Sequence, residues 1–271
     1  MFGSNRKSIC FIALAAITSL SFGYDANAQS FNSVSHIHQV KVVESKVLVL
    51  THEGLYKLIS KNNMKLVGKD KFDVMGFTTL GKDLFASGHP AKRSKAINPI
   101  GLVKSADGGL SWTAVSLVGK VDFHFLEGAG SDLYGTDSQS GNLMYSADSG
   151  KSWSSLGATP FTDIAVSPNM SGMAVAIMGS KLLLTKNAFK STKELKSTIK
   201  FTQVEWRDSG LYGLSGTSLY TSSDLGNTWN KLNTFKGATG ILSVSDQLIL
   251  VTVGSDIYTS SNFGKKFAQV S

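Results

Sequence analysis

An eight-residue pattern that recurs along the chain constrains the fold more than any other sequence feature. It has serine first, aspartate third, glycine fifth and tryptophan eighth. The clear copies are Ser105–Trp112, Ser146–Trp153 and Ser222–Trp229, a degraded copy is Ser260–Phe267, and two fainter copies begin at Ser60 and Thr185. Successive copies start 37 to 45 residues apart. A period near 40 residues indicates a radial or solenoidal repeat fold.

Each repeat also contains four short segments rich in β-branched and aromatic residues, as expected for strands. In the fifth repeat these segments are 203–207, 210–213, 218–221 and 229–232. Four strands per repeat make one propeller blade. We therefore predict an all-β, six-bladed β-propeller of four-stranded antiparallel blades, because a seventh blade would need about 40 further residues. The expected blades are 34–70, 71–118, 119–159, 160–200, 201–236 and 237–271.

The N-terminal segment 1–28 is predicted to be a secretory signal peptide. A basic start and an apolar stretch precede Ala26-Asn27-Ala28, which fits a cleavage site. Cleavage after Ala28 would leave 29–271 as a single propeller domain, periplasmic or secreted. The apolar stretch, about 15 residues long, is too short to span a membrane comfortably. The only cysteine, Cys10, lies inside it, so the mature chain has no thiol for catalysis or metal binding.

The net charge of +8 does not indicate a nucleic-acid partner. Lysines are spread over all repeats, with one denser run at 181–200. Nucleic-acid-binding proteins usually gather arginine and aromatic residues in one stripe, whereas scattered lysines keep exposed strand edges soluble. We expect a monomer with no nucleic-acid partner and no membrane span after signal cleavage.

The eight-residue pattern resembles the Asp-box of the BNR repeat family. In that family the box joins the third and fourth strands of a blade, on the face opposite the ligand-binding mouth. An aspartate in such a turn accepts backbone N–H groups, glycine allows a positive φ, and the tryptophan is expected to begin the fourth strand and bury its ring. The residues given this structural role are Asp107, Trp112, Asp148, Trp153, Asp224 and Trp229.

All five histidines fall where the propeller frame places its mouth. The first strand of each blade lines the central channel, and its start shares one face with the loop between the second and third strands. Candidate transition-metal ligands at this face are His36, His38, His52, His89 and His124, with Met75. Imidazole and thioether donors suit copper or zinc. Two alternatives are a polar pocket for an organic or sugar ligand, and histidines that only fill the channel together with water.

Further phrases, among them Thr51-His52-Glu53-Gly54 and Asp122-Phe123-His124, resemble small exported bacterial Asp-box propellers labelled glycosyl hydrolase or sialidase-like. This resemblance implies a fold more firmly than a reaction. A sialidase binds its substrate carboxylate with three arginines, but the mature chain has only Arg93 and Arg207, so sialidase activity is not expected. Another glycosidase would need two mouth carboxylates. The catalytic candidates are Glu53, Asp73, Asp122 and Asp137, with Asp163 and Glu205 also placed near the mouth.

The sequence therefore favours an exported binding or accessory module whose histidine-rich mouth holds a transition metal. One alternative is a non-sialidase glycosidase acting on an extracytoplasmic glycan. Another is a scaffold for exported proteins, as in Asp-box propellers that resemble photosystem assembly factors or sortilin-type receptors. The expected partner is accordingly a small ligand, a glycan or an exported protein. The inserted loop Pro90–Pro99 is expected to form a basic lip beside His89.

Overall fold

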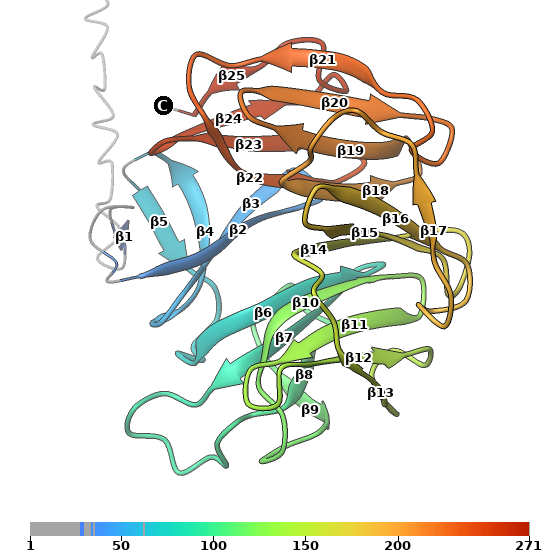
Figure 1. Cartoon of the computed structure of the whole chain (residues 1–271). Helices are drawn as coiled ribbons and strands as arrows, with labels where there is room; N and C mark the ends of the chain where they lie inside the picture. The colour runs from blue at the N-terminus through green and yellow to red at the C-terminus, as the bar shows by residue number, and fades with distance from the viewer. Residues whose placement is uncertain (1–27, 30–33, 35, 62, 271) are drawn as a thin grey trace, which may run out of the picture.

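The computed structural model describes residues 28, 29, 34, 36–61 and 63–270. This part of the chain is an all-β propeller of six blades that follow one another in chain order (Figure 1). The first strand of each blade contacts the first strands of both neighbouring blades, so the blades form a closed ring. The predicted fold class and blade number are confirmed. The described residues contain no helix long and apolar enough to cross a membrane.

Each blade is an antiparallel sheet of four consecutive strands, and blade one has a fifth strand at its outer edge. Blade one contains β1 (Ala28–Gln29), β2 (Ile37–Val43), β3 (Lys46–Thr51), β4 (Gly54–Ser60) and β5 (Asn63–Leu66). Blade two contains β6 (Asp73–Leu80), β7 (Asp83–His89), β8 (Leu102–Ser105) and β9 (Thr113–Ser116). Blade three contains β10 (Phe123–Ala129), β11 (Asp132–Asp137), β12 (Asn142–Ser146) and β13 (Ser154–Ala158).

The remaining blades follow the same plan. Blade four contains β14 (Asp163–Val166), β15 (Ala174–Met178), β16 (Lys181–Thr185) and β17 (Lys193–Leu195). Blade five contains β18 (Gln203–Arg207), β19 (Gly210–Ser215), β20 (Ser218–Ser222) and β21 (Asn230–Thr234). Blade six contains β22 (Thr239–Val244), β23 (Ile249–Val253), β24 (Asp256–Ser260) and β25 (Ala268–Gln269).

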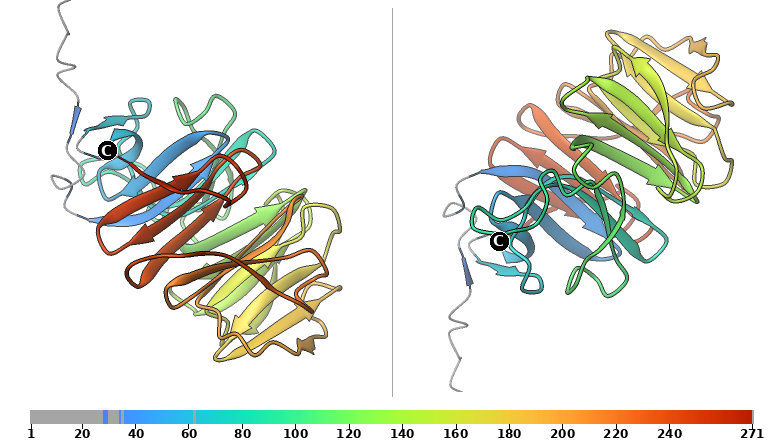
Figure 2. Two further views of the ribbon diagram at one scale, coloured as in Figure 1. Left: turned by 90° about the horizontal axis from the view of Figure 1, so that it is seen from above. Right: turned by 90° about the horizontal axis from the view of Figure 1, so that it is seen from below.

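The ring closes without a strand exchanged between the first and last blades. β1 pairs with β5 of blade one, and β25 pairs with β24 of blade six. Closure comes instead from packing, because Val40 of blade one and Leu250 of blade six share one core cluster. The Val42 N–H also donates to Ser243 Oγ at 2.9 Å. The C terminus lies beside blade one (Figures 1 and 2). Residues 1–27 of the predicted signal peptide lie outside the described residues.

The Asp-box turns share one hydrogen-bond pattern, which gives the aspartates a structural role. Asp107 Oδ1 accepts the Ser111 N–H at 3.0 Å, and Ser105 Oγ accepts the Gly109 N–H at 2.8 Å. The same bonds recur in the boxes of Asp148 and Asp224. Side-chain and backbone donors in these turns lower the pKa of the Asp148 and Asp224 carboxyl groups to about 2.

The degraded and faint boxes keep most of this pattern without an aspartate. Asn262 Oδ1 accepts the Lys266 N–H at 2.9 Å, and Asn187 Oδ1 accepts the Ser191 N–H at 2.9 Å. An asparagine retains the carbonyl oxygen that accepts these bonds, so the turn survives the substitution. The faintest box begins at Ser60, but its Asn62 lies outside the described residues.

Each Asp-box tryptophan lies one residue before the fourth strand, not inside it as predicted. Trp153 Nε1 donates to the Gly150 carbonyl oxygen at 2.9 Å, which keeps this residue in the turn. Its half-buried ring packs on Phe123 with 4.7 Å between ring centroids. The Phe123 ring in turn covers Gly135, where an added Cβ would lie 2.6 Å from it. Glycine at this position therefore lets the aromatic pair pack flat against the blade.

Candidate functional site

Three first strands carry a β-bulge at the same level, near the mouth. Their pairing register shifts by one residue at His38 in β2, at Met75 in β6 and at His124 in β10. A bulge bends its strand and redirects the extra side chain, and bulges are frequent beside functional sites. The three bulged residues are all candidate metal ligands predicted from the sequence.

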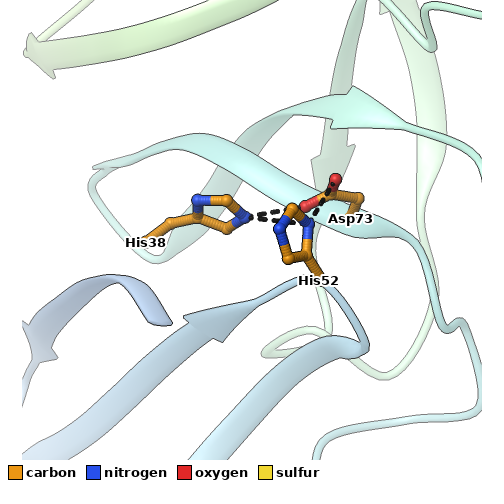
Figure 3. A group of neighbouring side chains, drawn as sticks. All are labelled: His38, His52 and Asp73. Carbon is orange, nitrogen blue, oxygen red and sulfur yellow. Dashed lines mark hydrogen bonds and ion pairs between the residues drawn. The ribbon is translucent and has the colours of Figure 1, made fainter. Parts of the chain in front are cut away.

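The first group of mouth residues, site one, consists of His38, His52 and Asp73 (Figure 3). His52 follows β3 directly, and Asp73 begins β6 of the next blade. The distance from His38 Nε2 to Asp73 Oδ1 is 2.9 Å, and that from His52 Nδ1 to Asp73 Oδ2 is 2.8 Å. The two imidazole nitrogens are 3.3 Å apart. Burial lowers the pKa of His38, although Asp73 opposes this shift, so the unprotonated imidazole that binds metals is favoured.

The second group, site two, consists of His89, Asp122 and His124. Asp122 Oδ2 lies 3.3 Å from His89 Nε2 and 2.8 Å from His124 Nε2. His89 Nδ1 donates to Asn98 Oδ1 at 2.8 Å, which leaves Nε2 facing Asp122. The Asp122 side chain is 3% exposed. Among the described residues, its Oδ1 has no hydrogen-bond partner.

Both groups offer two imidazoles and one carboxylate, a donor set that suits zinc and other divalent transition metals. All donor atoms of each site lie within 4.8 Å of one another. Two ligands about 2.0–2.1 Å from one tetrahedral ion are about 3.3 Å apart. The donor pairs described above are separated by 2.8 to 3.3 Å. These separations are close to those around one ion, so small side-chain movements would let each site accept one.

The two sites lie on either side of blade two. Asp73 of site one, in β6, is paired directly with His89 of site two, in β7. β6 also approaches β10 closely, because Gly76 lacks a side chain: an added Cβ would lie 2.5 Å from the Phe123 carbonyl oxygen. Site one thus joins blades one and two, and site two joins blades two and three.

The structure places four of the six predicted metal ligands in these two sites. His38 and His52 are in site one, His89 and His124 are in site two, and the ring of His36 lies 4.9 Å and 5.1 Å from those of His38 and His52. Met75 occupies the bulge of β6, two residues after Asp73. The sequence placed the histidines at the mouth, but it did not separate them into two groups.

The four catalytic candidates are all engaged by neighbouring groups. Asp73 and Asp122 contact two imidazoles each, as described above. Burial alone would raise the pKa of Asp137, but its bonds from Ser140 and from backbone N–H groups lower it. Asp137 therefore fixes the turn after β11. Glu53 lies in the turn before β4. Burial of Tyr56 raises the pKa of its hydroxyl group, and the nearby Glu53 carboxylate raises it further.

An ion-pair network joins the first strands of blades one, three and five, and no sequence pattern indicated it. The buried Lys41 of β2 donates to Glu127 of β10, and its Nζ lies 3.4 Å from Glu205 Oε1 of β18. Arg207 Nη2 lies 3.0 Å from Glu205 Oε2. The cluster contains two cations and two carboxylates. Glu205 is thus held by two cations inside the channel, which is a structural position rather than that of a mouth catalyst.

Asp163 of β14 lies beside this network, and its carboxyl group is expected to make stability depend on pH. Burial, together with Glu127 and Glu205, raises its pKa to about 8. The folded protein therefore favours the protonated carboxyl group. The stability that this preference contributes is present below the pKa of the unfolded state, near 4, and is lost as the pH rises through the pKa of the folded state, about 8.

We expect Asp163→Asn to stabilise the protein at pH 8.5 relative to the wild type, by on the order of 1–3 kcal/mol, and to be near neutral at pH 4. The amide keeps an oxygen to accept the Val204 N–H, now 2.7 Å from Asp163 Oδ2. Urea unfolding of both proteins across this pH range measures the difference. A constant difference at every pH would contradict the assignment.

Comparison with known proteins agrees with the repeat and the fold. Residues 257–270 match the model of the BNR-Asp box repeat. The chain carries a BNR-Asp box repeat. The matched segment begins inside β24, includes β25 and contains the degraded box with Asn262. No curated protein sequence matches the chain.

Solved structures with similar folds include proteins of several functions. YCF48 bound to a D1 peptide is 16% identical, with 90% of this chain and 83% of that chain covered and a TM-score of 0.53. PorZ, a surface component of the type-IX secretion system of Porphyromonas gingivalis, is 13% identical, with 90% and 34% covered and a TM-score of 0.58. The GH74 xyloglucanase from Xanthomonas campestris is 12% identical, with 86% and 45% covered and a TM-score of 0.55. At these identities the likeness shows the propeller fold alone, and this chain spans less than half of the last two proteins.

Proposed function

We propose that this protein is an exported β-propeller binding module that captures transition-metal ions, zinc or copper, at two sites in its mouth. The observation that carries the proposal is the presence of two separate sets of two imidazoles and one carboxylate. Export rests on the predicted signal peptide. The fold supplies the rigid frame, because each site takes its ligands from two neighbouring blades and a preorganised site binds more tightly than a mobile one.

Site two gives the stronger physical argument for a cation. A buried carboxylate oxygen without a hydrogen bond is costly, and Asp122 Oδ1 is in that position. The Asp122 carboxyl group is next to two imidazoles, and a divalent cation among these three side chains would give the unpartnered oxygen a ligand. Asn98 supports this arrangement because its bond to His89 Nδ1 fixes the ring orientation, as partners of metal-bound histidines commonly do.

The glycosidase and scaffold alternatives have less support from the geometry. A glycosidase requires one carboxyl group as the acid and a second as base or nucleophile, at a defined separation. Asp73 and Asp122 contact imidazoles, and Asp137 caps a turn. The scaffold alternative draws on structural neighbours such as YCF48, whose likeness to this chain extends only to the fold.

Metal analysis of residues 29–271, purified without a histidine tag, tests the proposal. We expect two equivalents of Zn²⁺ to remain after equilibration and gel filtration. His38→Ala with His52→Ala should remove one equivalent, and His89→Ala with His124→Ala should remove the other. Asp256→Asn is the control, because this carboxylate belongs to neither site and pairs with Lys61. Less than about 0.2 equivalents in the wild type would refute the proposal.

A further inference from the structure

Site two adjoins a cavity that contains no residue of site one in its lining. The cavity has a volume of about 250 Å³ and lies between blades three and four. Its lining residues include His124, a ligand of site two, and Ser138, whose hydroxyl donates to Asp122 Oδ2 at 2.8 Å. An ion bound at site two would therefore lie at the cavity wall.

Site two offers three protein donors to a metal ion. Site one also offers two imidazoles and one carboxylate, and the ring of His36 lies 4.9 Å and 5.1 Å from its two imidazoles. Site two has three donors and no fourth imidazole among the described residues, which contain all five histidines. Three protein ligands leave one coordination position for water or an exogenous ligand.

We propose that site two, when it holds a metal, binds a small hydroxylated aromatic compound that occupies the cavity and coordinates the metal through oxygen. The inference rests on the proposed function, because the ligand is captured through the metal. It makes the protein a receptor for a metal–ligand complex and not only for an ion.

The cavity walls indicate this ligand class. Aromatic and aliphatic side chains form one part of the lining, and hydroxyl groups form another. The apolar residues are Phe125, Leu143, Phe161 and Ile164, and the hydroxyl residues are Thr136, Ser138, Thr159 and Thr162. A volume of about 250 Å³ is below the range of about 300–1,000 Å³ typical of drug-sized ligands, so a compound with one ring fits best. Adjacent ring oxygens can chelate the metal.

Asp163 adds a specific hydrogen-bonding group to this cavity. Its Oδ2 accepts the Val204 N–H. Because burial and the neighbouring carboxylates raise its pKa to about 8, the carboxyl group carries a proton at neutral pH and can donate it in a hydrogen bond. A phenolic oxygen is a suitable acceptor, whereas a ligand with donors alone would not use this group.

The test uses the protein loaded with Co²⁺, whose visible absorption reports its coordination, and 4-nitrocatechol as the probe ligand. We expect one equivalent of the probe to bind, with changes in both the Co²⁺ and the nitrocatechol spectra. Thr162→Phe should fill the cavity and weaken binding at least tenfold while leaving the Co²⁺ content at two equivalents. Thr202→Phe is the matched control: both threonines are exposed and precede a first strand, and their N–H groups donate to the second strand of their own blade.

Further variants separate the inference from the proposed function. His38→Ala with His52→Ala should remove one Co²⁺ and leave probe binding unchanged. If the protein holds Co²⁺ but no probe, or if Thr162→Phe binds the probe as the wild type does, the inference is overturned while metal capture stands. If probe binding persists without metal, the inference is also wrong. If no Co²⁺ binds, both proposals fail.

Discussion

Replacing Lys41 with methionine is expected to lower the free energy of unfolding by about 3–5 kcal/mol, the usual cost of removing one partner from a buried ion pair. The Lys41 ammonium is buried in the channel between Glu127 and Glu205. Burial alone would lower the pKa of Lys41, but these carboxylates raise it above its ordinary value. Methionine keeps most of the side-chain volume, so the loss is mainly one of charge.

The cost should depend on pH and on the partner. Burial raises the pKa of Glu127, and Lys41 opposes that shift. Without Lys41 the pKa of Glu127 rises further, so the folded state favours the protonated carboxyl and the penalty should shrink as pH falls. Adding Glu127→Gln to Lys41→Met should recover part of the loss at pH 8, because the network is then left with one cation, Arg207, and one carboxylate, Glu205.

Urea unfolding at pH 5 and pH 8 measures both effects. Lys46→Met is the matched control, since Lys46 is exposed and its Nζ lies 3.6 Å from Glu44 Oε2. Exposed pairs of this kind contribute about 1 kcal/mol or less. A cost for Lys41→Met no larger than that of the control would show that the network does not stabilise the ring.

The repeat pattern determined much of the fold in advance, because its spacing fixes the blade register. Strand β18 has the bounds expected from the sequence, Gln203–Arg207. The predicted tryptophan position was wrong by one residue. At Trp153 and Trp229 the indole N–H bonds to the turn, a contact that composition does not encode. Closure of the ring could not be read from the sequence either, since it depends on contacts between residues about 200 positions apart, such as the hydrogen bond from the Val42 N–H to Ser243 Oγ.

The sequence predicted the face of the propeller on which the candidate site lies, but not the arrangement of its side chains. Blade register placed every histidine at the mouth, but the separation into two sites depends on bulges at His38 and His124, which strand periodicity does not reveal. The role of Asp73 as the carboxylate of site one follows from the contact between blades one and two. The ion pairs of Lys41 were missed because no local pattern marks a charge that points into a channel.

Zinc is expected to raise the melting temperature of the mature protein by about 10–20 °C when the free ion is about 100-fold above the dissociation constant of each site. Each site then contributes about 2.7 kcal/mol, and 1 kcal/mol shifts the midpoint by about 2–4 °C in a domain of 150–250 residues. The effect is thermodynamic linkage, because the ligands come from separate blades and meet only in the folded ring. His38 and His52 lie in blade one, Asp73 and His89 in blade two, and Asp122 and His124 in blade three.

Differential scanning fluorimetry with Zn²⁺, followed by excess EDTA, measures this shift and its reversal. His38→Ala with His52→Ala should retain about half of the zinc-dependent shift, and the quadruple variant that also lacks His89 and His124 should retain none. Mg²⁺ is the control ion, because it prefers oxygen ligands and holds its water tightly. An equal shift in the quadruple variant would place the zinc elsewhere on the surface. A shift that requires all four histidines would instead show that blade two, whose Asp73 and His89 face each other, couples the two sites into one unit.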